Sequence, residues 1–282
     1  MLYKSETYSY IVDKMQIIEF PMFNIKLNIS KIAFNIFGID IYWYALIIVF
    51  AIISALFYCR KIDGMYKIKF ETILNICIWI IPIGVICARL YYVLFELEHF
   101  LQKPISILNI RDGGLAIYGG IIGGIITIIF YCKKRKINLL NLLDYLAPAV
   151  ALAQSIGRWG NFFNVEAYGI ETNLPWRMCI IKDGIQKCVH PTFLYESICT
   201  FLIFILLCNL QKRRKFKGEI LYLYLILYAF VRFWIEGIRI DSLMLYNFRI
   251  SQILSIAVFI LFLGIFTYAV IKNHIMSKKG KK

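Results

Sequence analysis

The residues best suited to chemistry lie in the run 157–169, which reads Gly-Arg-Trp-Gly-Asn-Phe-Phe-Asn-Val-Glu-Ala-Tyr-Gly. This run places Arg158, Asn161 and Glu166 in one of the long apolar stretches of the chain. Bilayer hydrocarbon penalises a charged side chain by roughly 2.5 kcal/mol or more, so such residues are usually paired or functional. Arg158 and Asn161 are three residues apart and share a helix face. The run predicts a polar binding site, with pairing of Arg158 to a carboxylate as the simpler alternative.

A second polar group surrounds residue 236. Arg232, Glu236 and Arg239 are spaced i, i+4 and i+7, so they share one helix face. One interpretation is a helix end that neutralises itself and extends its charges to the membrane surface. A second interpretation is an anion-binding site, in which Glu236 orients one guanidinium and leaves a bidentate donor for phosphate. The presence of two arginines for one carboxylate favours this second interpretation.

The elements that must position these groups are membrane helices. The chain has 282 residues and is 60% hydrophobic, whereas a soluble domain is roughly half apolar. Seven stretches approach the roughly 20 apolar residues that cross a bilayer. These lie at about 40–59, 72–95, 113–132, 142–164, 192–209, 219–239 and 250–271. We predict an all-α, polytopic integral membrane protein with about seven transmembrane helices and a small extracytoplasmic loop region. Residues 1–20 lack the apolar core of a cleavable signal peptide, so the first span is expected to remain in the membrane.

Loop charges predict the orientation of these spans. The formal net charge is +15, and the basic residues cluster in short loops between spans, which favours a topology signal over nucleic-acid binding. The denser set comprises 60–69, 133–136, 212–217 and 272–282. By the positive-inside rule this set is cytoplasmic, with the N-terminus outside and the C-terminus inside.

The charged residues inside the spans are expected at one depth. At 1.5 Å per residue, Arg158 lies roughly 24 Å along its span, Arg232 about 20 Å and Arg89 about 25 Å, all toward the outer face. Tyr44 and Tyr118 fall in the outer thirds of theirs. Scattered structural charges have no reason to share a level, so this coincidence favours one site beneath the outer head groups.

The expected extracellular loop contains a hairpin signal. Asp183-Gly184 is typical of a two-residue turn and lies midway between Cys179 and Cys188. The two cysteines would then face each other across the strands, where side chains approach closely, so a disulfide between them is predicted. The eight cysteines show no metal-ligand spacing.

Several polar or small residues are interpreted as structural. The pairs Gly119/Gly123 and Gly120/Gly124 have the GxxxG spacing of helix packing. Gly113-Gly114 precedes its span and is expected to form a turn.

Two helix starts account for further polar residues. Asn141 and Asp144 are interpreted as capping residues at the head of the fourth span. Thr192, with Glu196 one turn later, is interpreted as the start of the fifth.

Together these residues resemble the phosphatidylglycerol–prolipoprotein diacylglyceryl transferase family. The family signature is similar to Gly-Arg-x-Gly-Asn-Phe-x-Asn-x-Glu-x-x-Gly, and residues 157–169 match every fixed position. Further pieces match in order over roughly residues 22 to 272. They are Tyr42-Trp43-Tyr44, Gly113-Gly114 to Gly120, Asn141 with Asp144, His190-Pro191 through Tyr195-Glu196, and Arg232 to Glu236 with Arg239.

The resemblance implies an enzyme of the bacterial cytoplasmic (inner) membrane. It would move the diacylglyceryl group of phosphatidylglycerol to the lipobox cysteine of a prolipoprotein signal peptide, releasing glycerol phosphate. The implied partners are phosphatidylglycerol, prolipoprotein and membrane lipid, without nucleic acid, cofactor or metal. A leaving phosphate requires fixed positive charge, which suits the arginines.

The resemblance also implies the site residues. The expected catalytic residues are Arg158, Arg232, Tyr118 and Glu166. The expected substrate-binding residues are Arg158, Asn161, Gly169, Tyr44, Gly114, Glu236, Arg239 and Asn141. Asn161 and Glu166 are expected to hold Arg158 or the head group. Family members commonly carry histidine at Tyr118, and a phenol with a pKa near 10 is a poor base at neutral pH.

The resemblance also bears on domain boundaries and on rival functions. It assigns residues 22–272 to a transmembrane catalytic domain, with 1–21 as an N-terminal extension and 273–282 as a basic cytoplasmic tail. The main alternative function is a transporter or channel for an anionic solute, which would place polar residues along a whole pore.

Overall fold

The computed structural model describes residues 16–109, 113–182, 184–242, 244–246 and 248–279. Within it the chain divides into two compact units, one of residues 1–58 with 146–282 and one of residues 59–145. Residues 1–15 of the expected extension, Asp183 of the expected turn and 280–282 of the expected tail lie outside the described residues.

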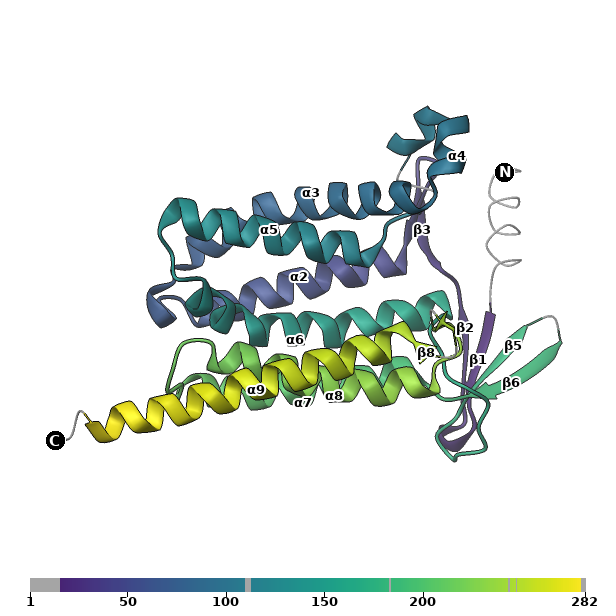
Figure 1. Cartoon of the computed structure of the whole chain (residues 1–282). Helices are drawn as coiled ribbons and strands as arrows, with labels where there is room; N and C mark the ends of the chain where they lie inside the picture. The colour runs from purple at the N-terminus through teal and green to yellow at the C-terminus, as the bar shows by residue number, and fades with distance from the viewer. Residues whose placement is uncertain (1–15, 110–112, 183, 243, 247, 280–282) are drawn as a thin grey trace. The chain divides into compact units, whose positions relative to one another are not determined.

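Seven helices are long and apolar enough to cross a membrane, as predicted (Figure 1). They are α2 (Trp43–Lys61), α3 (Phe70–Phe95), α5 (Ile117–Arg135), α6 (Leu139–Asn164), α7 (Thr192–Gln211), α8 (Glu219–Ile238) and α9 (Ile250–Lys279). A short helix α4 (Leu97–Gln102) and the 3-10 turn η3 (Pro104–Leu108) follow α3.

Four of the expected helix starts, those of α2, α3, α5 and α6, are shifted by two to four residues, and the last two have a local cause. Helix α5 begins at Ile117 rather than near 113, because Gly113 and Gly114 adopt positive φ angles of 92° and 76°. Helix α6 begins at Leu139, and the side chain of Asn138 accepts the backbone N–H of Asn141. Asn138 therefore caps this helix, and the interpretation of Asn141 as its cap was wrong.

The first unit carries a four-stranded antiparallel sheet in the order β2-β1-β5-β6. Its strands are β1 (Gln16–Phe20), β2 (Ile25–Ile29), β5 (Met178–Lys182) and β6 (Ile185–Val189). A core that includes Ile18, Ile180, Phe162 and Phe193 joins one sheet face to the end of α6 and the start of α7. Cys179 and Cys188 pair across β5 and β6 and form a disulfide, which confirms that prediction.

Small and aliphatic side chains pack the helices of the first unit. Ala147 and Ala151 of α6 meet Ile203 and Leu207 of α7, and Ile220 of α8 completes the cluster. Helix α9 lies alongside α8 (Figure 1). The two-residue strands β7 (Met244–Leu245) and β8 (Phe248–Arg249) pair just before α9 begins.

In the second unit α3 packs closely against α5. A Cβ atom on Gly119 would lie 2.4 Å from the carbonyl oxygen of Cys87, and one on Gly123 would lie 2.7 Å from the Cys87 side chain. Both distances are shorter than any normal contact, so glycine is required at these two positions. The packing role predicted for this GxxxG pair is confirmed.

Candidate functional site

A buried carboxylate joins three helices of the first unit. Glu196, on the second turn of α7, is only 2% exposed. Its Oε1 lies 2.7 Å from Nη2 of Arg158 on α6, and its Oε2 lies 3.1 Å from Nη1 of Arg232 on α8. The hydroxyl of Tyr228 donates a 3.2 Å hydrogen bond to the same carboxylate. One carboxylate thus holds two guanidinium groups in fixed positions.

The chain of ion pairs continues along α8. Nη2 of Arg232 lies 2.6 Å from Oε2 of Glu236, an ionic contact without an aligned hydrogen bond. Nη1 of Arg239 lies 4.0 Å from the same oxygen. Arg239 also donates from Nε and Nη2 to the two oxygens of Asp241, at 3.0 and 2.9 Å. The spacing of Arg232, Glu236 and Arg239 therefore produces one connected face, as predicted.

The Arg239–Asp241 pair keeps both of its partners ionised. Burial opposes their charges, but the hydrogen bonds and attraction across the pair outweigh it. The pKa of Asp241 is consequently held below its ordinary value, and the pKa of Arg239 is raised. Asp241 thus occupies the Nε–Nη2 edge of Arg239.

The ion pairs lie at the same end of α6, α7 and α8. Arg158 is six residues from the end of α6, Glu196 is four residues into α7, and Arg232 is six residues from the end of α8. At 1.5 Å per residue these positions are roughly 6 to 9 Å from the helix ends. The common depth predicted for Arg158 and Arg232 is confirmed, since both contact Glu196.

Glu166 has a different partner from the one expected. Its Oε1 accepts hydrogen bonds from Asn161 at 2.9 Å and from Asn164 at 3.1 Å. Arg158 pairs with Glu196 instead. Of the two alternatives expected for Glu166 and Asn161, the one in which they hold Arg158 was wrong, because the chain leaves α6 at Asn164 and bends Glu166 back onto the amides of the last turn. The other alternative, an orienting role toward the head group, stays a prediction.

Two glycines of the signature run make room for neighbours. A Cβ on Gly160 would lie 2.6 Å from the Tyr44 ring, so its absence lets that ring rest on α6 beside the turn of Arg158. A Cβ on Gly169 would lie 2.7 Å from that of His190. Gly169 also donates its N–H to the His190 carbonyl and pairs with Arg239 in an isolated bridge.

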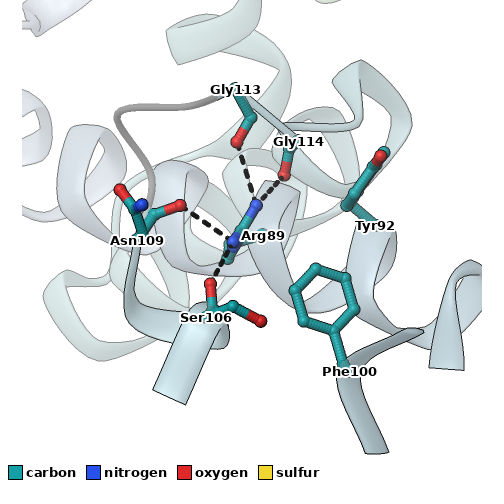
Figure 2. A pocket seen from close by; sticks show the side chains of 7 residues that line it. All are labelled: Arg89, Tyr92, Phe100, Ser106, Asn109, Gly113 and Gly114. Atoms are coloured by element: carbon teal, nitrogen blue, oxygen red, sulfur yellow. Dashed lines mark hydrogen bonds between the residues drawn. The ribbon is translucent and has the colours of Figure 1, made fainter. Parts of the chain in front are cut away.

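The second unit holds a different polar arrangement around Arg89, which is 8% exposed (Figure 2). All five of its N–H donors bind backbone carbonyls. The acceptors are those of Ile107, Ser106, Asn109, Gly113 and Gly114, at 2.6 to 3.0 Å. Its guanidinium also lies 5.1 Å from the ring centre of Phe100.

These contacts explain Gly114. A Cβ at this position would lie 2.3 Å from Nη1 of Arg89 and 2.9 Å from the Tyr92 ring. Arg89 thus fixes the turn that leads into α5, and Tyr118 lies half-buried in the first turn of that helix. Asn141 lies in the first turn of α6, whose last turns carry Arg158.

Two site residues were missed from the sequence. Glu196 was interpreted as part of a helix start, but Pro191 occupies the N-cap without a side-chain cap bond, and Thr192 donates its hydroxyl to the Ala167 carbonyl. The signal was available, since Glu196 is the one carboxylate in the apolar stretch 192–209 and two arginines in other spans needed a partner. Asp241 lies just beyond the predicted span and was not considered.

The architecture defines a multi-pass membrane protein with a chain of ion pairs near one end of its helices. The family model described as prolipoprotein diacylglyceryl transferase matches residues 31–268, and the chain belongs to that family.

Curated relatives agree with this family. A phosphatidylglycerol–prolipoprotein diacylglyceryl transferase of Finegoldia magna is 49% identical, over 82% of this chain and 92% of the relative. The enzymes of that name from Clostridioides difficile and Enterococcus faecalis are each 44% identical. The first match covers 89% of this chain and 97% of the relative, and the second covers 83% and 88%.

Proposed function

We propose that this chain transfers the diacylglyceryl group of phosphatidylglycerol to the lipobox cysteine of prolipoproteins. The cysteine sulfur forms a thioether with the glyceryl carbon, the bond from that carbon to the phosphate oxygen breaks, and glycerol phosphate leaves. The thiol proton is released when the nucleophile forms. Family membership and the names of close relatives support this reaction. The observation in the site that carries it is the carboxylate of Glu196 bridging Arg158 and Arg232.

The arginines suit the leaving group. Negative charge grows on the phosphate as its bond to carbon breaks, and preorganised cationic donors stabilise that charge most where water is excluded. Arg158 pairs with Glu196 through Nη2, and a guanidinium has five N–H donors, so donors remain for a phosphate oxygen. Arg232 is held from both sides by Glu196 and Glu236. We assign the primary phosphate contact to Arg158, support to Arg232 and an outer contact to Arg239.

The nucleophile comes from the substrate. A thiol reacts as its thiolate, and nearby guanidinium groups lower its pKa without any cysteine of the enzyme. We assign Glu166 and Asn161 to orienting the glycerol head group. These two residues hydrogen-bond to each other, whereas Arg158 pairs with Glu196. Tyr44 and Tyr118 are proposed to line the head-group site, with Tyr118 as a catalytic residue. Gly114, Gly169 and Asn141 are proposed substrate-binding residues.

The proposed setting is the bacterial cytoplasmic membrane, with the N-terminus outside and the C-terminus cytoplasmic. The denser set of basic loops supports this orientation. Residues 22–272 are proposed as the transmembrane catalytic domain. Strand β1 belongs to the segment that precedes this proposed domain, and it pairs with β2 and β5 in the four-stranded sheet.

The direct test uses the purified full chain with phosphatidylglycerol and a synthetic lipobox peptide. Mass spectrometry should find a diacylglyceryl adduct on the peptide cysteine. A peptide with serine in place of that cysteine should remain unmodified. An unmodified cysteine peptide, with chain that is folded and monodisperse, would contradict the proposal.

Arg158→Lys tests the assigned phosphate contact. Lysine keeps the charge but cannot hold Glu196 and a phosphate with one planar fork. A hydrogen bond to a charged group contributes about 1.5–3 kcal/mol, so kcat/KM should fall about 10- to 100-fold. Arg60→Lys, at an exposed ion pair with Asp63, is the matched control. Near-normal turnover of Arg158→Lys would rule out the bidentate role.

A further inference from the structure

A separate hairpin stands before the first membrane span. Strands β3 (Ile32–Ile36) and β4 (Ile39–Tyr42) pair antiparallel and form a sheet of their own. Cross-strand partners share a face, so the pairs Phe34–Ile41 and Ile36–Ile39 lie on one face. The pair Asn35–Asp40 lies on the other, joined by a 2.6 Å hydrogen bond. The hairpin is therefore amphipathic, with one aliphatic and aromatic face and one polar face.

The apolar face is open. Phe34, Ile36 and Ile39 are 45%, 48% and 44% exposed, and Phe37 at the tip is 101% exposed. A two-stranded hairpin is marginally stable in water on its own. Four neighbouring apolar residues without cover would also promote aggregation. A water-exposed hairpin is thus a poor explanation of this sequence.

The turn adds an independent observation. Phe37 and Gly38 have φ angles of 50° and 80°, which is the backbone of a two-residue turn that favours Asn-Gly. An aromatic residue at positive φ is disfavoured, and asparagine would fit this position better. The sequence instead places a fully exposed phenylalanine there. Turn stability does not explain why phenylalanine occupies position 37. A contact between the Phe37 ring and something outside the chain explains it.

The hairpin is continuous with a membrane helix. Strand β4 ends at Tyr42, and α2 begins at Trp43. The Trp43 N–H donates to the Lys31 carbonyl at 3.0 Å, which ties the base of the hairpin to the start of α2. Figure 1 shows β3 running across the end of α2 rather than continuing along its axis. An element in this position lies in the plane of the membrane surface where α2 enters the bilayer.

We propose that the β3–β4 hairpin lies in the head-group region of that leaflet and inserts Phe37 and its apolar face among the lipid chains. The polar face, with Asn35 and Asp40, then points to water. Among the described residues no third strand pairs with β3 or β4, so their outer edges carry backbone groups that hydrocarbon does not tolerate but the interface does. Trp43 and Tyr44 at the junction are residues that favour the same depth. The occupant of this surface is the bilayer itself.

The test places a trifluoromethyl-phenylalanine probe at one position of the full chain in phosphatidylglycerol-containing nanodiscs. Fluorine relaxation is measured with dissolved oxygen, which concentrates in lipid, and with a water-soluble gadolinium chelate. Phe50, 61% exposed on α2, is the lipid control, and the exposed Gln186 on β6 is the water control. The probe at 37 should respond to oxygen as at 50 and lose most of the chelate broadening seen at 186.

A second variant separates lipid contact from turn structure. Phe37→Asn should preserve the hairpin, because asparagine suits the turn, but it should raise chelate broadening of a probe at Phe34. Three outcomes would overturn the proposal. A probe at 37 could match the one at 186, it could be shielded from both reagents and so be covered by protein, or Phe37→Asn could leave the Phe34 probe unchanged.

Discussion

At the scale of single residues, Glu196 is the centre of the candidate site. A carboxylate that is 2% exposed and shared by Arg158 and Arg232 does more than balance charge. Removing one partner from a buried ion pair costs about 3–5 kcal/mol, because the remaining charge stays desolvated. The two guanidinium groups could then no longer be held in the geometry that a phosphate requires.

We therefore expect Glu196→Gln to lower the free energy of unfolding by about 3 kcal/mol or more and to abolish most of the transferase activity. Thermal unfolding in detergent and the peptide assay measure the two effects. Glu71→Gln, at the exposed start of α3, is the matched control and should change stability far less. Normal stability and turnover in Glu196→Gln would mean that the bridge is dispensable.

His190 gives a pH dependence. It lies outside the helices, beside the hydroxyl of Tyr195 at 3.2 Å, and burial lowers its pKa below its ordinary value. Between the folded pKa and the unfolded value of about 6.5, the unfolded chain binds more protons. The contribution of His190 to stability is thus complete above about pH 6.5 and is lost as the pH falls through that window.

Unfolding temperatures between about pH 5 and pH 8 should show this loss. His190→Gln keeps a hydrogen-bonding side chain without a titrating proton, so its profile should be flatter on the acid side. If both proteins show the same acid slope, another group is responsible.

At the scale of elements, the membrane helices and one local hairpin follow from sequence, whereas the hairpins β1–β2 and β3–β4 and the long-range pairings were not predicted. The seven spans and the Cys179–Cys188 hairpin were predicted because apolar length and turn chemistry act within a few dozen residues. The pairing of β1 with β5 joins segments roughly 160 residues apart, and nothing local specifies it. For the same reason Arg158 and Arg232 were found, whereas their shared partner Glu196 on a third helix was not.

Arg89 shows how one side chain organises an element. Lysine has three donors and arginine five, so Arg89→Lys must leave at least two of the five carbonyls without this partner. An unsatisfied buried group costs about 1–3 kcal/mol, and because these carbonyls are only partly buried, the lower end of that range applies. We expect a loss of about 2 kcal/mol in unfolding free energy, and faster proteolysis in the segment 103–109.

Limited proteolysis with mass mapping, together with thermal unfolding, measures this effect. Arg135→Lys, at the exposed end of α5, is the control. Cleavage that increases equally at all exposed loops would indicate general destabilisation instead of a local role for Arg89.

At the scale of the whole molecule, charge and apolarity divide the chain between membrane and water. The net charge of +15 is concentrated at one set of loops. The arginines within the spans instead form ion pairs with carboxylates or hydrogen bonds with backbone carbonyls. The positive-inside rule predicts orientation from this uneven distribution of basic residues between the two sets of loops. We therefore expect the molecule to have a single orientation. The disulfide on the hairpin β5–β6 fits the opposite, oxidising side.

Reporter fusions test the orientation. A green fluorescent protein joined after the last residue should fluoresce, because a cytoplasmic C-terminus lets it fold. Alkaline phosphatase inserted after Gly184, at the turn of the hairpin β5–β6, should be active because that turn faces outside. The reverse insertions, with phosphatase at the C-terminus, serve as controls and should be inactive. Replacing the basic residues 212–217 by serine should weaken the orientation signal and produce a mixed population, since we propose that those charges hold the loop between α7 and α8 in the cytoplasm. Active phosphatase at the C-terminus of the unaltered chain would invert the proposed topology and move the ion-pair site to the cytoplasmic leaflet.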